Sequence, residues 1–248
     1  MVCMRIGALR ILLLAGLLAV LVASLAFCRS SDAVARGRAA DHRATALRVL
    51  GEHLAREFAE GKVLIVSNPY VQAGRGDADV RRFEAAGVEG LKRGWGDRLE
   101  LLGVVYPALR PEALANPERI PVDPESKTPL SFLQTDRAWD DLWKSHPEAD
   151  VWVSLIGVPV NLMRLEVWRR PRPALALLLP DVRMLGGRAG VIGALESRKL
   201  TAMVVPRPGS PPATAPPEPD YRAEFERRFL LVTAENVARV IELYPALF

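Results

Sequence analysis

Cysteine and histidine are scarce in this sequence of 248 residues, which has two cysteines and three histidines. Cys3 and Cys28 lie within or next to the first apolar segment, so the rest of the chain offers neither a disulfide framework nor a cysteine metal site. The histidines, His42, His53 and His146, lack the close spacing of metal ligands, and we expect each at the surface. The sequence therefore predicts no metal site and no cofactor.

An excess of one charge is lacking over most of the chain. The net charge is +4, but residues 29–248 carry 31 basic and 29 acidic side chains. A nucleic-acid surface needs a clustered positive field. This near-balance argues against nucleic acid as a partner.

Catalytic motifs are absent as well. Ser154 falls inside an apolar run, without the flanking glycines of the nucleophile motif G-x-S-x-G. Residues 181–190 (DVRMLGGRAG) are rich in glycine, but their spacing matches neither GxGxxG nor the phosphate-binding loop. The sequence assigns no catalytic residue and favours a protein that is not an enzyme.

One long apolar run stands near the N-terminus. Residues 11–27 are seventeen positions without a charge, and a helix of that length, at about 1.5 Å per residue, just crosses a bilayer. We expect residues 1–28 to be a signal anchor or a signal peptide, with the membrane as a partner through residues 11–27. Cleavage after Ala26 and lipidation of Cys28 are the alternatives to a retained anchor.

A tether should join this segment to the rest of the chain. Residues 29–40 are rich in serine, alanine, glycine and arginine. The soluble domain that follows is expected to be periplasmic or otherwise extracytoplasmic. Arg29, Arg36, Arg38 and Arg43 outnumber the arginines before the apolar run, which leaves the opposite orientation as an alternative.

Residues 41–248 alternate between helical and strand patterns. Short apolar runs typical of strands buried on both faces occur at residues 63–66, 99–105, 151–156, 174–179, 201–205 and 229–232. Helical patterns cover residues 47–58, 79–93, 136–145, 189–198, 221–227 and 235–243. This order predicts an α/β domain with a single doubly wound, mostly parallel sheet of about six strands and flanking helices. The domain is Rossmann-like and follows an N-terminal transmembrane or signal helix.

Two proline-rich excursions interrupt the alternation. Residues 107–135 hold six prolines and predict a long surface loop, which is a lid or an insertion. Residues 206–219 hold seven prolines and predict an exposed polyproline II segment. That segment is a spacer or, alternatively, a ligand for a partner module.

Polar residues that follow the predicted strands are candidates for ligand binding, because open parallel sheets bind ligands outside the carboxyl ends of their strands. These candidates are Ser67, Asn68, Tyr70, Tyr106, Asn161, Asp181, Arg183 and Arg188. Structural explanations compete with this one, since Asn68 before a proline suits a turn and the glycines after Asp181 suit close packing.

Alternating strands and helices after an export signal resemble one lobe of a periplasmic substrate-binding protein. Such a likeness of fold does not establish function. The leading hypothesis is a non-enzymatic, membrane-associated α/β module of the cell envelope that binds a small ligand or a protein partner. The alternatives are an enzyme with an active site at the strand ends and a structural subunit of an envelope assembly.

Intact mass and membrane fractionation test the predicted anchor. Expressed in a bacterial host with its N-terminus unaltered, the protein is expected to be full length and membrane-bound, because residues 11–27 are long enough to remain inserted. Loss of residues 1–26 or 1–27 would instead mean export by cleavage or lipidation.

Overall fold

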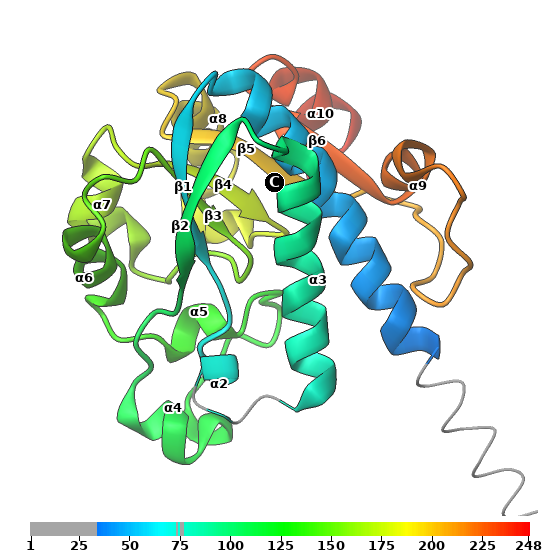
Figure 1. Ribbon diagram of the computed structural model, residues 1–248. Helices are drawn as coiled ribbons and strands as arrows, with labels where there is room; N and C mark the ends of the chain where they lie inside the picture. The colour runs from blue at the N-terminus through cyan, green and yellow to red at the C-terminus, as the bar shows by residue number, and fades with distance from the viewer. Residues whose placement is uncertain (1–33, 73, 75–76) are drawn as a thin grey trace, which may run out of the picture.

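Six strands form one sheet in the computed structural model, which describes residues 34–72, 74 and 77–248 (Figure 1). The strands are β1 (Gly61–Val66), β2 (Leu99–Val105), β3 (Val151–Ser154), β4 (Ala174–Leu178), β5 (Leu200–Pro206) and β6 (Phe229–Thr233). Their order across the sheet is β2-β1-β3-β4-β5-β6. All neighbouring pairs are parallel except β5 and β6, so the predicted six-stranded, mostly parallel α/β sheet is confirmed.

Both faces of the sheet are buried, because successive side chains of a strand point to opposite sides. In β1, Val63 and Ile65 pack into one hydrophobic core, whereas Leu64 and Val66 pack into the other. Strands buried in this way must be apolar at every position. This requirement explains why the strands are recognisable in the sequence as continuous apolar runs.

Helices cover the two faces. Residues 34–57, α3 (Ala78–Trp95) and α9 (Tyr221–Arg228) pack on one face. The other face is covered by α6 (Ala138–Ser145), α7 (Glu166–Arg169), α8 (Gly187–Glu196) and α10 (Val237–Leu243). Residues 34–40, which were predicted as part of a tether, are helical and continue into the packed helix.

The helix of residues 34–57 lies beside α3 and touches it backbone to backbone (Figure 1). Glycines make this approach possible. A Cβ atom added at Gly94 of α3 would stand 2.1 Å from the carbonyl oxygen of Arg48, and one at Gly90 would stand 2.4 Å from that of Ala44. Both helices are therefore held at a separation that only glycine permits.

The first proline-rich excursion contains short helices. Residues 107–135 include α4 (Pro111–Ala115), the 3-10 turn η1 (Pro117–Arg119) and α5 (Leu130–Leu133), and Ala113 is fully buried. The other short helices of the described chain are α2 (Pro69–Gln72), η2 (Leu162–Arg164), η3 (Val182–Leu185) and η4 (Pro245–Leu247). The predicted surface loop is thus a folded insertion.

The second excursion is exposed along most of its length but is tied down through its carbonyl groups. Arg228 donates to the carbonyl oxygens of Pro211 and Pro212 at 2.9 and 3.1 Å, and Arg227 donates to that of Pro216 at 2.7 Å. Both arginines also bind the buried carboxylate of Glu224. Burial raises the pKa of Glu224, but the Glu218 backbone amide and the two arginines outweigh burial and lower it. These hydrogen bonds fix the segment to α9. A freely moving spacer would not need such contacts.

No helix within residues 34–72 and 77–248 combines the length and hydropathy needed to cross a bilayer. The predicted anchor at residues 11–27 and the lipidation candidate Cys28 lie outside the described residues.

Gly94→Ala tests the close contact between the two helices. The added Cβ would stand 2.1 Å from a backbone oxygen that cannot rotate away, so we expect the free energy of unfolding to fall by about 2 kcal/mol despite the better helix propensity of alanine. Denaturant unfolding measures this change. The matched control is Gly193→Ala in α8, which has open space around the added atom and should gain up to about 1 kcal/mol. Equal effects of the two substitutions would contradict the contact.

Candidate functional site

The residues predicted to bind a ligand lie where expected, after the carboxyl ends of the strands, but most of them are engaged in contacts within the chain. Asn68 accepts a hydrogen bond from the backbone amide of Tyr70 at 3.0 Å, and the Tyr70 hydroxyl donates to the carbonyl of Ala113 at 2.8 Å. Asn161 donates to the carbonyl of Asp136 at 2.8 Å. Tyr106 is partly buried after β2.

The folded insertion is tied to this edge through Arg183. The guanidinium of Arg183 binds Asp181 at 2.7 Å and Asp123 of the insertion at 2.9 Å. Hydrogen bonds from Arg183 hold the pKa of Asp181 below its usual range, against the opposing effect of burial. Arg188 is exposed in α8 and does not contribute to these contacts of Arg183. The group around Asp181 thus anchors the insertion, and its predicted role in ligand binding stays a prediction.

A buried ion pair fills the point where the strand order reverses, between β1 and β3. Arg43 donates to Glu84 at 2.8 Å, and the Ser67 hydroxyl donates to the same carboxylate oxygen at 2.7 Å. Arg43 also reaches the carbonyl of Leu155, directly after β3. All three side chains are buried. The position where α/β sheets usually bind ligands is therefore occupied by the protein itself.

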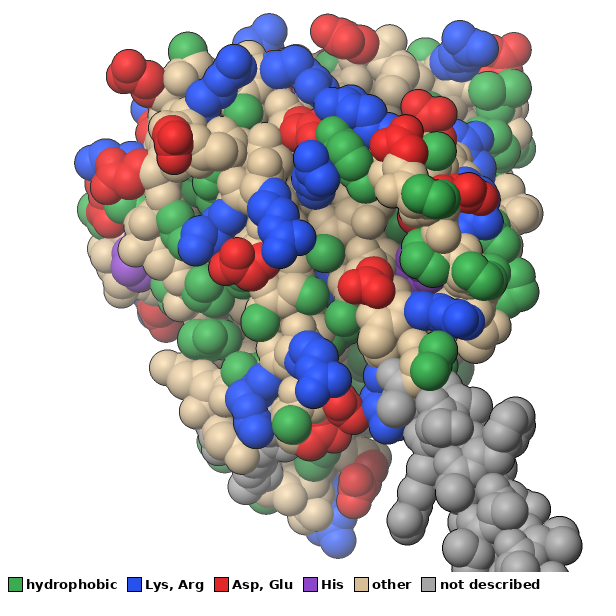
Figure 2. All heavy atoms as spheres, turned by 45° about the vertical axis from the view of Figure 1, so that its right-hand side comes forward, with side chains coloured by type: hydrophobic (Ala, Val, Ile, Leu, Met, Phe, Trp, Pro, Cys, Tyr) green, Lys and Arg blue, Asp and Glu red, His purple; other side chains and the backbone are tan. Residues whose placement is uncertain are grey.

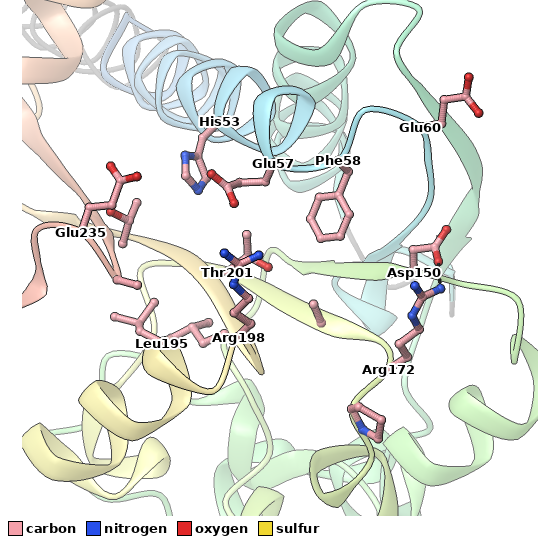
Figure 3. Close-up of a pocket in the computed structure, with 15 residues that line it drawn as sticks. His53, Glu57, Phe58, Glu60, Asp150, Arg172, Leu195, Arg198, Thr201 and Glu235 are labelled. Carbon is pink, nitrogen blue, oxygen red and sulfur yellow. Dashed lines mark hydrogen bonds and ion pairs between the residues drawn. The ribbon is translucent and has the colours of Figure 1, made fainter.

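A cavity of about 290 Å³ opens at the opposite edge of the sheet, at the amino ends of the parallel strands (Figure 3). Its walls come from the end of the helix of residues 34–57, the end of α8, the first residues of β4 and β5, and the turn after β6. Polar side chains lining it are His53, Glu57, Glu60, Asp150, Arg172, Arg198, Thr201, Thr233 and Glu235. None of the residues proposed from the sequence is among them.

His53 is buried at this cavity, with 8% of its surface exposed, so the prediction of a surface histidine was wrong. The prediction was also wrong for His42, which is 6% exposed.

Burial lowers the pKa of His53, and the nearby Glu57 and Glu235 only partly oppose that effect. The ring is therefore neutral at pH 7. Its Nε2 atom has no hydrogen-bond partner among the described residues.

Six charged side chains line the cavity, and only Arg172 and Asp150 pair with each other among the described residues. Figure 3 shows His53 and Glu57 entering from the helix above, with Arg198 rising toward them from below. The side chains of Glu57, Glu235 and Arg198 form no hydrogen bond or ion pair in the part of the chain that the structure describes. Arg172, in contrast, is bound to Asp150 at 2.6 Å. Within the described residues, the cavity thus offers one unpaired guanidinium and three unpaired carboxylates, those of Glu57, Glu60 and Glu235, and all four side chains are exposed.

Arg198 has an unusual backbone. Its φ is +58°, a left-handed conformation that side chains other than glycine rarely adopt. The residue follows the last turn of α8, a place where glycine normally ends a helix. An arginine at this position costs about 1 kcal/mol relative to an unstrained residue. The residue with the strained backbone is therefore also the one whose guanidinium lines the cavity without a partner among the described residues.

Lys199, the residue after Arg198, stabilises another part of the cavity wall. It is buried, and its ammonium donates to the carbonyl oxygens of Val167, Arg170 and Pro173 at 2.7, 3.0 and 2.5 Å. These carbonyls flank the loop that carries Pro171 and Arg172 of the cavity wall. Burial lowers the pKa of Lys199 to about 8, so the amine is still protonated at neutral pH and can donate all three bonds.

A metal centre does not arise from these residues. The described part of the chain holds no group of three or more histidine, cysteine, aspartate or glutamate side chains placed to bind a metal ion.

Comparisons with known proteins give distant likenesses only. No protein-family model matches the sequence, and no curated protein matches it significantly. A sugar-binding protein of a sugar ABC transporter from Bacillus halodurans is 12% identical, with a TM-score of 0.45 over 79% of this chain and 64% of that one. A periplasmic solute-binding protein from Actinobacillus succinogenes with bound D-allose is 8% identical, with a TM-score of 0.43 over 79% of this chain and 60% of the other.

A carbohydrate transporter solute-binding protein from Agrobacterium radiobacter in complex with D-arabinose gives similar values, 14% identity and a TM-score of 0.43 over 79% of this chain. This chain spans 60 to 64% of the length of these three proteins. The values describe a likeness in the α/β arrangement alone.

Lys199→Met tests the support of the cavity wall. Methionine has a similar length but leaves three buried carbonyls without a donor, so we expect a loss of about 3 kcal/mol in the free energy of unfolding. The exposed Lys62→Met is the control and should change stability by less than about 0.5 kcal/mol.

The pH dependence of the same variant tests the amine directly. The folded protein releases the Lys199 proton near pH 8, whereas the unfolded chain keeps it to about pH 10.4. Between these values the unfolded state binds more protons, so wild-type stability rises with pH relative to Lys199→Met. A stability difference between wild type and variant that stays constant from pH 7 to pH 10 would contradict the lowered pKa.

Proposed function

We propose that this chain is a non-enzymatic α/β module that binds a small ligand, and that the cavity at the amino ends of the strands is the binding site. The observation that carries the proposal is the set of unpaired polar groups around that cavity: Glu57, Glu235, Arg198 and Nε2 of His53. The side chains of Glu57, Glu235 and Arg198 are exposed to solvent, so a ligand would bind them in place of water, whereas Nε2 of His53 is buried.

The distribution of the other ionisable groups supports binding over catalysis. The carboxylates with shifted pKa values, Asp181 and Glu224, lie outside the cavity, and both values are lowered by arginine partners that also fix proline-rich segments. Their shifts therefore have a structural explanation. Figure 2 shows acidic and basic side chains interspersed over the face it presents, without one large apolar area on that face.

The proposed location is the cell envelope, with the membrane as partner through residues 11–27. This part of the proposal rests on the sequence. The helix of residues 34–57 adds a geometric consequence, since His53 and Glu57 line the cavity at its last turn, about 35 Å from residue 34. A domain anchored through its N-terminus would thus carry the cavity well away from the anchored end of this helix.

Thermal unfolding of the full chain with small metabolites tests this function. The panel holds sugars, amino acids, carboxylic acids and amines at millimolar concentration. We expect at least one compound to raise the melting temperature of the wild type by about 5 °C, because a ligand well above its Kd stabilises the folded state. Arg198→Gly should abolish that rise while its own melting temperature does not fall, since glycine adopts a positive φ without strain.

The matched control is Leu179→Gly. Leu179 is the other described non-glycine residue with a positive φ, +46°, and it lies after β4 at the opposite edge of the sheet. It should keep the ligand response. The proposal fails if no compound stabilises the wild type, or if every stabilising compound acts equally on Arg198→Gly.

A further inference from the structure

We propose that the ligand of this cavity is a small zwitterion of the amino-acid type, with an ammonium group, a carboxylate group and an apolar side chain. The inference rests on the proposed function, because it assigns a chemical class to the same cavity. Three features of the walls carry it: an acidic side, one free guanidinium and an apolar remainder.

The acidic side is formed by Glu57 and Glu235. Glu57 belongs to the last turn of the helix of residues 34–57, and Glu235 belongs to the turn after β6. Both act electrostatically on His53, so the two carboxylates approach the same point from different elements. Neither side chain is paired with a cation of the described chain. An ammonium group can donate a hydrogen bond to each of two such carboxylates.

Helix ends strengthen the preference for a cation. Two helices, residues 34–57 and α8, finish at this cavity. The carboxyl end of a helix carries a partial negative charge from its free carbonyl groups. His53 adds no positive charge of its own, because burial lowers its pKa and keeps the ring neutral. Arg56 also acts on His53 and opposes the two carboxylates, but it does not line the cavity.

Arg198 supplies the opposite charge. In Figure 3 its side chain rises from the turn between α8 and β5 into the cavity, below Glu57. Arg172 is already bound to Asp150, so Arg198 is the cavity arginine left to receive an anion from outside. A guanidinium matches a carboxylate with two parallel hydrogen bonds. The cavity thus holds the complement of a carboxylate within the same space as the complement of an ammonium.

The remaining walls and the volume limit the rest of the ligand. Phe58, Ala174, Leu195 and Leu200 supply apolar surface. A volume of about 290 Å³ lies just below the range of roughly 300–1,000 Å³ for ligand sites. One short apolar side chain fits this space better than a large ring system.

Ligands with one charge or none fit less well. A carboxylic acid would meet Glu57 and Glu235, an amine would leave Arg198 unpaired, and a sugar would leave all three without a counter-charge. Each of these ligands forgoes at least one of the charge-assisted hydrogen bonds that a zwitterion can form with the cavity. The zwitterion is the class that satisfies both sides at once.

Calorimetric titration of the full chain with the common L-amino acids tests this inference. We expect at least one amino acid with an apolar side chain to bind with a Kd below about 1 mM. The analogue of the best binder that lacks the amino group and the analogue that lacks the carboxyl group should each bind at least about tenfold more weakly, because each loses a charged hydrogen bond.

Two variants assign each end of the ligand. Arg198→Gly should weaken the amino acid about tenfold or more and leave the amine analogue unchanged. Glu57→Gln should weaken the amino acid and the amine analogue while sparing the carboxylate analogue. The controls are Leu179→Gly, which has the same kind of backbone strain outside the cavity, and Glu196→Gln, an exposed carboxylate at the end of α8 that does not line it.

The outcomes separate this inference from the proposed function. If no amino acid binds, but another compound of the metabolite panel does and loses its binding in Arg198→Gly, the cavity is a ligand site and the zwitterion is wrong. If an amino acid binds equally to wild type and to both cavity variants, the site is wrong too. If nothing in either panel binds, both proposals fail.

Discussion

Burial of the sheet on both faces is the constraint on which the rest of the structure depends. Each central strand sends alternate side chains into two separate cores, so every position must be apolar and both faces must be covered by helices. Helices that lead directly into the parallel strands have their carboxyl ends at the edge where those strands begin, whereas α9 leads into the antiparallel β6 and ends at the opposite edge. The negative ends of the helix of residues 34–57 and of α8 meet there, at the cavity lined by Glu57.

The fold was largely predictable because this constraint leaves a plain trace in the sequence. The predicted strand at residues 99–105 coincides with β2, and the other strand boundaries differ by one or two residues. The direction of β6 was not predictable, since an antiparallel edge strand has the same apolar pattern as a parallel one. The histidines were placed wrongly for a similar reason: a spacing argument about metal ligands says nothing about how deeply His53 and His42 are packed.

The candidate site was not predictable from the sequence. Its polar groups lie at positions 53, 57, 198 and 235, which only the folded sheet brings together. The general rule pointed to the carboxyl ends of the strands. In this chain the folded insertion is bound to that edge through Arg183, and the switch point is filled by Arg43 and Glu84. These arginine-to-carboxylate contacts engage the charges of Arg43, Glu84, Asp181 and Arg183 within the chain.

One signal of the site was nevertheless present in the sequence. The helix that ends at Glu196 is followed by Ser197, Arg198 and Lys199, with no glycine or asparagine to take the left-handed position. Glycine would remove the strain at Arg198, so the arginine is explained by its side chain and not by the backbone. Leu179 shows that a positive φ alone does not mark a site, because its side chain carries no charge and meets no cavity. It is the combination of strain, an unpaired cation and a cavity that distinguishes Arg198, and the neighbouring Lys199 holds the opposite wall in place.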